Sequence, residues 1–453
     1  MRLAYLTSQF PFAYLGETFF GPELNVLTDL CERVHVIPAR PELRTTAFGQ
    51  LRTVDVRISP VEMGTLLSAL TEAVCHPVRA VAAFGRLAFP RYGFDAKIKN
   101  IGLFPKALAV ARYVRKERVE HIHANWLTTP GTIAYVASMM TGIPWSCTAH
   151  AHDIFSDNLL KEKARSARFI RVIAERNRRH LARVTGVAAD QLHLVHVGVD
   201  VPPQAAPLPL DRPLQIVCAA RLDPIKGHED LLRALAILRD RGVAFHCDIA
   251  GNGPLEDHLA SIVAQLKLQG FVNLRGLVEH RFLLDELRNG KYDVLALPSI
   301  ELELVGKHSH EGIPVALIEA MAVGVPCVAT DTGCIPELID EHTGVLVNQR
   351  DPNALADALL RLARDRTLRR SLGEAARERI NNEFNVKTTT RTLYELIRAD
   401  MERNESSGLA DSSYISPTTN IPVALRSELL KGNVGNGNHT GPETLGYTTS
   451  DVR

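Results

Sequence analysis

Short apolar runs alternate with segments of helical periodicity along most of the chain. In the first half, the apolar runs predict strands at 2–7, 33–38, 119–124, 144–149 and 192–196. In the second half, they predict strands at 214–219, 244–250, 271–276, 292–297 and 325–329. Strands that alternate with helices form βαβ units and parallel sheets, so the pattern predicts an α/β fold.

A proline-rich segment divides this pattern into two halves. Prolines occupy five positions between 201 and 213, directly between two predicted strands. Such a composition is typical of a linker. We therefore predict two Rossmann-like domains that face a cleft, one of residues 1–205 and one of residues 206–385. Parallel sheets bind ligands at the carboxyl ends of their strands, so we expect the functional site in that cleft.

The character of the sequence changes toward the end of the chain. Residues 386–404 show one more helical pattern, with Leu393, Leu396 and Ile397 as its apolar positions. After Asn404, the residues Ser, Thr, Asn, Gly and Pro dominate. Such a segment has too little apolar surface to bury, so we predict a disordered tail over residues 405–453.

Composition and charge exclude several classes of protein. The 453 residues are 45% hydrophobic and 23% charged, which excludes collagen-like, mostly disordered and disulfide-scaffold proteins. The net charge of +1 argues against a nucleic-acid partner. The seven cysteines form no CxxC pair and are expected to be free thiols in a reducing compartment. Because no apolar stretch is long enough for a signal peptide or a spanning helix, we expect a cytoplasmic protein.

The richest segment for chemistry runs from Asp293 to Gly344. It reads as a strand, a loop, a helix that begins near Pro314, and a second strand. Glu311 lies in the loop, and Glu319 lies inside the helix among apolar residues. The free amides at the start of such a helix attract an anion.

These two glutamates have three interpretations. They could hold a nucleotide sugar, with one carboxylate facing the sugar and the other binding the paired hydroxyls of a ribose. They could instead be the acid and base of a glycosidase, but both would then flank one bond. Glu319 could also be a solvated helix residue, although an acid among apolar neighbours requires a partner. The position at a helix start favours the first interpretation.

Two cations follow the first strand of the second domain. Arg221 and Lys226 lie in the loop after the strand at 214–219. Fixed cations there could neutralise the β-phosphate of a leaving nucleoside diphosphate without a metal. The alternative is a pair of solvated loop cations. The chain has no Asp-x-Asp triplet and no GxxxxGK[ST] loop, so we expect no obligatory metal and no nucleoside triphosphate site.

The stretch EGIPVALIEAMAVGVPCVATDTGCIPELI, which contains Glu311 and Glu319, resembles the signature of retaining glycosyltransferases of the GT-B fold, glycosyltransferase family 4. The most similar group is that of colanic-acid and exopolysaccharide biosynthesis. The resemblance extends over roughly residues 1–400. It implies transfer of a sugar from a nucleotide-diphosphate sugar, with a UDP-sugar favoured, to a polysaccharide or lipid-linked oligosaccharide.

The resemblance also implies roles for individual residues. Catalysis is expected of Glu311, His150, Arg221 and Lys226. Contacts with the donor are expected of Arg221, Lys226, Gly16, Val278, Gly312, Pro314, Val315, Ala316 and Glu319. His150 ends the strand at 144–149 and would contact the donor sugar. Val278 belongs to the turn expected at the base, and Gly16 permits close approach of the backbone to the phosphates. Retention is expected through front-face attack rather than a covalent glycosyl-Glu311. The helix at 386–404 is expected to pack on the first domain.

Several alternatives remain open. A GDP-mannose-dependent transferase, a GT-B phosphorylase or epimerase, and a non-catalytic nucleotide-sugar sensor would share the fold. A metal site would use His121 and His123 together with His150 or His152. The basic segments 75–116 and 159–184 are either solvated helix faces or a surface for peripheral association with the inner face of the plasma membrane.

Overall fold

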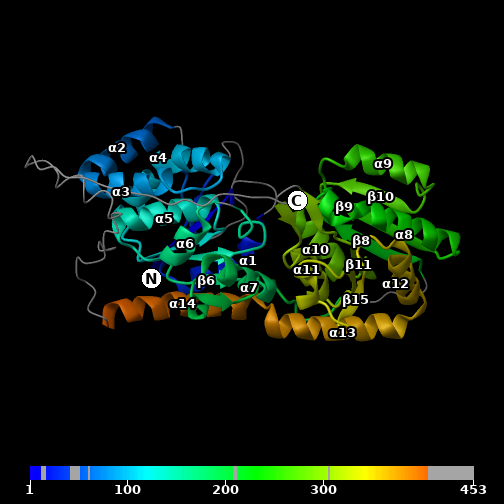
Figure 1. Ribbon diagram of the computed structural model, residues 1–453. Coiled ribbons are helices and arrows are strands. Elements are labelled where there is room, and N and C mark those ends of the chain that lie inside the picture. The colour runs from blue at the N-terminus through cyan, green and yellow to red at the C-terminus, as the bar shows by residue number, and fades with distance from the viewer. Residues whose placement is uncertain are drawn as a thin grey trace, which may run out of the picture. The chain divides into compact units, whose positions relative to one another are not determined.

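Two parallel β-sheets with helices packed against them make up most of the described part of the chain (Figure 1). The structure is a computed structural model, and it describes residues 1–11, 17–40, 52–59, 62–156, 158–207, 212–304 and 307–406. Each predicted strand overlaps an observed one. The predicted α/β class with two Rossmann-like sheets is thereby confirmed.

The first sheet has seven strands in the order β3-β2-β1-β4-β5-β6-β7, all parallel. Its strands are β1 (Arg2–Thr7), β2 (Arg33–Pro38), β3 (Val54–Asp55), β4 (His121–Asn125), β5 (Trp145–Ala149), β6 (Ile170–Val172) and β7 (Leu192–Leu194). Its helices are α1 (Phe20–Leu30), α2 (Met63–Cys75), α3 (Pro77–Ala88), α4 (Phe94–Lys116), α5 (Thr129–Thr141), α6 (Leu160–Ser166), α7 (Glu175–Thr185) and the 3₁₀ turn η1 (Ala189–Gln191). The strand order reverses between β1 and β4, which is where such sheets bind ligands.

The second sheet has six parallel strands in the order β10-β9-β8-β11-β14-β15. Its strands are β8 (Leu214–Ala219), β9 (Phe245–Ala250), β10 (Val272–Gly276), β11 (Val294–Leu297), β14 (Cys327–Thr330) and β15 (Gly344–Val347). Its helices are η2 (Pro224–Lys226), α8 (His228–Asp240), α9 (Glu256–Gln265), α10 (His280–Arg288), α11 (Val315–Ala322), η3 (Ile335–Glu337), α12 (Pro352–Arg364) and α13 (Arg366–Glu383). A separate antiparallel ribbon pairs β12 (Leu302–Leu304) with β13 (Lys307–Ser309). Here the order reverses between β8 and β11.

The last helix of the second half packs on the first sheet. Helix α14 (Val386–Ser406) buries Leu393 and Ile397 in one cluster with Leu3 and Tyr5 of β1. The other face of β1 packs into a different cluster, so the strand is buried on both sides, as its continuous apolar run requires. The part of the predicted tail from 407 to 453 lies outside the described residues.

The two chain crossings between the sheets lie side by side. The Val199 N–H donates to the carbonyl of Phe384 at 2.9 Å, and the Val386 N–H donates to the carbonyl of Val199 at 3.0 Å. The ring of His196 stacks on Phe384 with centroids 4.3 Å apart. Since residues 208–211 of the proline-rich segment lie outside the described residues, the domain boundary at 205–206 stays a prediction.

The strands β3, β6, β12, β13 and β15 were not predicted, and β6 corrects the interpretation of segment 159–184. This segment is not one basic helix but contains α6, β6 and α7. Arg171 lies inside β6 and is buried. Its charge is tolerated there because its guanidinium pairs with Glu23 at 2.5 Å and donates to the carbonyl of Val195 at 3.0 Å. Lys163 is also buried and donates to the carbonyl of Leu127 at 2.7 Å. Two of the nine cations of this segment therefore serve the interior of the protein.

Among the described residues, no helix is both long enough and apolar enough to span a lipid bilayer.

Candidate active site

The loops that follow β8 and β11 touch each other at the point where the strand order reverses. The Ile300 N–H donates to the carbonyl of Ile225 at 2.8 Å. Gly227 has a φ of +65°, and a Cβ there would lie 1.8 Å from the carbonyl oxygen of Pro298. This backbone shape favours glycine, and only glycine allows the close approach. The contact places Lys226 beside the loop that leads to Glu311.

Lys226 and Glu311 form an ion pair. Lys226 Nζ lies 2.5 Å from Glu311 Oε1, and both side chains are largely buried. The backbone of Glu311 is held as well, because its carbonyl accepts a hydrogen bond from the Cys334 N–H at 3.1 Å. A Cβ on Gly333, whose φ is +58°, would lie 2.2 Å from that same carbonyl oxygen. Two residues that the sequence placed in separate motifs are therefore in direct contact.

Arg221 has a different environment from Lys226. Its guanidinium pairs with Asp223 in the same loop, and its side chain is 73% exposed. The loop rests on the Gly251-Asn-Gly253 turn, since the Leu222 N–H donates to the carbonyl of Asn252 at 2.8 Å. Arg221 is thus positioned at the carboxyl end of β8, as predicted, but it faces solvent.

The helix α11 begins at Val315, one residue later than the sequence suggested. Pro314 is the N-cap residue, with an extended backbone at φ −69° and ψ 123°. Its carbonyl accepts from the amides of Leu317 and Ile318 at 3.1 and 3.4 Å. The amides of Val315 and Ala316 precede these first helical bonds and are the groups that can bind an anion.

The loop before α11 lies against the first domain beside His150. A Cβ on Gly312 would lie 3.4 Å from the Cβ of Ala151 and 3.7 Å from Ile173. Glycine therefore allows the two chain segments to approach closely. The structure brings the Gly312 loop and the His150 loop together, as the predicted cleft requires.

His150 is buried immediately after β5. Its ring stacks on Trp126 with centroids 4.0 Å apart and meets the ring of Phe19 edge-on at 5.9 Å. Burial lowers the pKa of His150 to about 3, so the ring is neutral. Its Nε2 has no hydrogen-bond partner among the described residues. A buried polar atom of this kind is ready to bind a hydroxyl group of a ligand.

Asp153 positions His150, a role that the sequence did not reveal. Its buried carboxylate accepts from the backbone N–H groups of His150 and Leu127, each at 2.9 Å. Burial is also the main reason that the pKa of Asp153 rises, to about 6. The carboxylate links the loops after β4 and β5.

Glu17 fixes the loop after β1. Its carboxylate accepts from the amides of Gln9 and Phe10, each at 2.8 Å, and from Trp126 Nε1 at 2.8 Å. In the sequence, the position of Glu17 directly after Gly16 was the signal that could have indicated this role. Gly16 itself, predicted to approach the phosphates, lies outside the described residues.

Glu319 has a partner that the sequence analysis missed. His280 Nε2 lies 2.6 Å from Glu319 Oε1, and both residues face a small cavity that Phe19 and Asp200 also line. Burial lowers the pKa of His280, but the hydrogen bond and the charge of Glu319 outweigh this, so the pKa lies above its ordinary value. Glu319 is therefore not a solvated helix residue.

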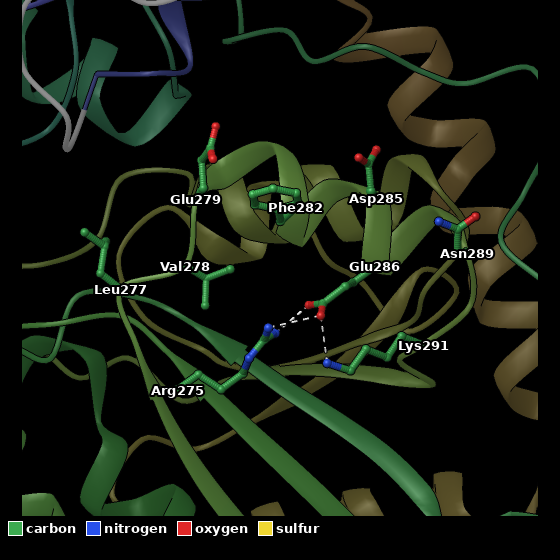
Figure 2. Close-up of a pocket in the computed structure, with 9 residues that line it drawn as sticks. All are labelled: Arg275, Leu277, Val278, Glu279, Phe282, Asp285, Glu286, Asn289 and Lys291. Atoms are coloured by element: carbon green, nitrogen blue, oxygen red, sulfur yellow. Dashed lines mark hydrogen bonds and ion pairs between the residues drawn. The ribbon is translucent and has the colours of Figure 1, made fainter.

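Val278 lines a hollow of about 800 Å³ between β10 and α10 (Figure 2). Figure 2 shows the Glu286 carboxylate between Arg275 and Lys291 on the floor of this hollow. Arg275 Nη2 donates to Glu286 at 3.0 Å, and Lys291 Nζ donates to it at 2.8 Å. Phe282 forms part of the wall. The contact of Val278 with a base stays a prediction.

The histidines of the alternative metal site form hydrogen bonds inside the sheet. His121 Nε2 and His123 Nδ1 lie 2.7 and 2.8 Å from Ser146 Oγ. His123 Nε2 lies 2.9 Å from Thr148 Oγ1. Burial lowers the pKa of both rings to about 3. Within the ranges that the structure describes, no three His, Cys, Asp or Glu residues are grouped as metal ligands.

Comparison with known proteins defines the class. Residues 203–379 match the family model described as glycosyl transferases group 1. The amylovoran biosynthesis glycosyltransferase AmsK of Erwinia amylovora is 34% identical over 226 residues, which are 48% of this chain and 53% of AmsK. A GDP-mannose-dependent α-(1-6)-phosphatidylinositol monomannoside mannosyltransferase of Mycobacterium tuberculosis (strain ATCC 25618 / H37Rv) is 31% identical over 188 residues, which are 41% of this chain and 47% of that protein. The chain spans about half the length of the curated relatives it matches.

Solved structures with both domains share the fold. The sucrose-phosphate synthase of Thermosynechococcus elongatus is 20% identical, with a TM-score of 0.70 over 89% of this chain and 99% of its own. Anabaena HepE in complex with UDP-glucose is 16% identical, with a TM-score of 0.62 over 88% of this chain and 100% of its own. The predicted GT-B fold is confirmed, and residues 203–379 form a glycosyl transferases group 1 domain.

Proposed function

We propose that this protein is a retaining glycosyltransferase of exopolysaccharide biosynthesis. It would transfer a sugar from a nucleotide-diphosphate sugar, with a UDP-sugar favoured, to a polysaccharide or lipid-linked oligosaccharide. The observation that carries the proposal is the contact between Lys226 and Glu311 at 2.5 Å, where the loops after β8 and β11 meet. It lies inside the matched domain and beside the amides at the start of α11.

The second domain would hold the nucleotide and its diphosphate. Arg221 and Lys226 would neutralise the charge that grows on the β-phosphate as it leaves, and the amides of Val315 and Ala316 would add to this. Glu319, held by His280, would bind the ribose hydroxyls. Val278 and its turn would contact the base. No step of this proposal needs a metal ion.

Glu311 and His150 would position the transferred sugar. The neutral ring of His150 offers an unpartnered Nε2 to a sugar hydroxyl. Glu311 holds Lys226 through their ion pair. It would also contact the transferred sugar.

Retention would follow from front-face attack. The acceptor hydroxyl forms the new bond to the anomeric carbon while the bond from that carbon to the β-phosphate oxygen breaks. The leaving phosphate takes the acceptor proton, so atoms and charge balance without a protein base. A covalent glycosyl-Glu311 is disfavoured because the Lys226 cation holds this carboxylate and weakens it as a nucleophile.

The relatives support two donors. The complex of HepE with UDP-glucose supports a UDP-sugar. The GDP-mannose-dependent relative makes GDP-mannose the second candidate.

The proposal is tested by incubating the purified chain with UDP-glucose, UDP-galactose, UDP-N-acetylglucosamine or GDP-mannose and lipid-linked glycan acceptors. We expect acceptor-dependent release of one nucleoside diphosphate and an α-linked product by NMR. An inverted anomer would refute retention. Dependence on free phosphate would indicate a phosphorylase, epimerised donor without acceptor an epimerase, and donor binding without turnover a sensor.

A further inference from the structure

Helices α2 and α3 expose large apolar side chains to solvent. On α3, Val78 and Val81 are 79% and 74% exposed, and Phe89, directly after the helix, is 84% exposed. The same holds for the apolar residues Met63, Leu66, Leu67, Leu70, Val74, Phe84, Phe94 and Ile98. Most of the large exposed apolar residues of the described chain therefore lie between positions 63 and 98.

The amphipathic pattern of these helices is inverted. The inward face of α2 carries Thr65, Ala69 and Glu72, and the inward face of α3 carries Ala80, Ala83 and Leu87. Apart from Leu87, the buried residues of these helices are thus small or polar, while Val, Met, Phe and most Leu side chains face outward. The two helices pack against each other and against α4 (Figure 1). Solvent alone gives no stabilisation to such a face, so it indicates an interaction surface.

Positive charge surrounds the apolar side chains. Between positions 76 and 99, the chain carries Arg79, Arg86, Arg91, Lys97 and Lys99 against the single acid Asp95. Arg86, Arg91 and Lys99 are exposed. Glu72 of α2 is buried and paired with Arg115, so it adds no exposed negative charge. An exposed apolar face with basic residues around it matches the interface of an anionic bilayer.

We propose that the α2–α3 surface, residues 63–99, docks the protein on an anionic lipid bilayer. The apolar side chains enter the boundary between headgroups and acyl chains, and the cations bind lipid phosphates. A protein partner would need an apolar surface that covers the same face and an acidic rim that pairs with the same cations. In the second basic segment, 159–184, Lys163 and Arg171 are buried inside the fold and are not available at the surface.

The proposal does not rest on the glycosyltransferase activity. A bilayer surface would nevertheless bring a lipid-linked acceptor to the enzyme.

Vesicle flotation with the full chain tests the surface. The probes are phosphatidylcholine vesicles with and without phosphatidylglycerol. We expect flotation with the anionic vesicles and a loss of about tenfold or more in apparent affinity for Val78→Asn/Val81→Asn/Phe89→Ser, because three apolar anchors are removed. Leu194→Asn is the matched control, since Leu194 is exposed on β7 outside this surface.

A charge-reversal variant tests the cations. Arg86→Glu/Arg91→Glu/Lys99→Glu is expected to abolish the preference for phosphatidylglycerol. Lys267→Glu/Arg361→Glu/Arg364→Glu makes the same change of net charge at exposed positions of the second domain and is expected to keep it. Donor-dependent nucleotide release in solution is expected to stay unchanged in both variants, which separates this proposal from the proposed function.

Three results would overturn the proposal. The wild-type chain could fail to float with anionic vesicles, or the apolar variant and the Arg86→Glu/Arg91→Glu/Lys99→Glu variant could both bind them like wild type. A concentration-dependent dimer that disappears in the apolar variant would assign the face to a second copy of the chain instead. Circular dichroism of every variant shows whether it has folded.

Discussion

Lys226 Nζ lies 2.5 Å from Oε1 of Glu311, and this ion pair joins the loop after β8 to the loop before α11. The cation that we propose for a leaving phosphate is thus paired with the carboxylate that we propose for the sugar. If the donor binds as proposed, its diphosphate competes with Glu311 for Lys226. Substitutions of Lys226 and of Glu311 should therefore change diphosphate binding in opposite directions.

Glu311→Gln is expected to strengthen binding of the nucleoside diphosphate severalfold while it lowers kcat about 100-fold or more, because Lys226 loses its competing carboxylate and the sugar loses a contact. Lys226→Met is expected to weaken both binding and turnover. Calorimetry with UDP and GDP and steady-state kinetics provide the two measurements. Glu374→Gln, which breaks the exposed pair with Arg370, is the control. Weaker diphosphate binding by Glu311→Gln would contradict the competition.

Arg221→Ala is expected to reduce kcat/KM about 100-fold, the typical effect of one missing donor at a developing negative charge. Its effect on the free energy of unfolding should stay below about 1 kcal/mol, since the Arg221 side chain of its pair with Asp223 is exposed. Kinetics and urea unfolding measure the two effects. Arg233→Ala removes a similarly exposed arginine from α8 and should change neither quantity appreciably. Full activity of Arg221→Ala would exclude Arg221 from the site.

His280→Gln is expected to raise KM for the donor about tenfold with a smaller change in kcat, because Glu319 loses the group that positions it. The double variant with Glu319→Ala should be no worse than Glu319→Ala alone. His258→Gln removes an exposed histidine that contacts Glu229 at 2.9 Å and serves as the control. Additive effects of the two changes would show that His280 does not act through Glu319.

The same pair predicts a pH dependence. The pKa of folded His280 lies above the ordinary value. Its contribution to stability is therefore fully present below about pH 6.5 and is lost as the pH rises through the raised value. The Tm difference between wild type and His280→Gln should shrink toward alkaline pH. A difference that grows with pH would contradict the pairing.

Gly227→Ala is expected to destabilise the fold by several kcal/mol, because its φ is +65° and a Cβ would lie 1.8 Å from the carbonyl oxygen of Pro298. Gly242 has a similar φ of +73°, but nothing lies within 4 Å of its Cβ position. Gly242→Ala should therefore cost only about 1 kcal/mol, from backbone strain. Urea unfolding of both variants makes the comparison, and equal losses would disprove the close loop contact.

Acid is expected to unfold the protein through its buried histidines. Burial lowers the pKa of His121, His123 and His150 to about 3 and that of His228 to about 4. Below about pH 6.5 the unfolded chain binds more protons than the folded chain. The free energy of unfolding therefore decreases as the pH is lowered, by up to about 1.4 kcal/mol per pH unit for each of these histidines. His228→Gln should reduce this slope between pH 4 and 6.5, whereas His258→Gln should not. Chemical unfolding at several pH values tests the slope.

The sequence predicted the site best where one motif contains the relevant residues. Glu311 and Glu319 stand eight positions apart on either side of a helix start, so local spacing was sufficient to single them out. His280 is 39 positions from Glu319, and Trp126 is 109 positions from Glu17. Nothing local marks such partners, because they meet only where the carboxyl ends of separate strands converge.

Charge patterns misled where burial reversed their meaning. The basic run 159–184 reads the same whether its cations face water or the interior, and only the sheet shows that Arg171 lies inside β6. Likewise, helical periodicity at 63–88 cannot say which face turns inward. The structure shows that most large apolar residues of α2 and α3 face outward, while the buried residues other than Leu87 are small or polar.

The sequence alone determined the alternation of strands and helices, the two parallel sheets and the positions of the candidate motifs, because periodicity and helix-start patterns depend on neighbours within a few residues. The tertiary structure decided which charged groups pair, which are buried, and which apolar face stays open. Those outcomes depend on contacts between distant loops and on solvent exclusion. Lys226 therefore had a predicted role from its sequence, but Glu311 became its partner only through the fold.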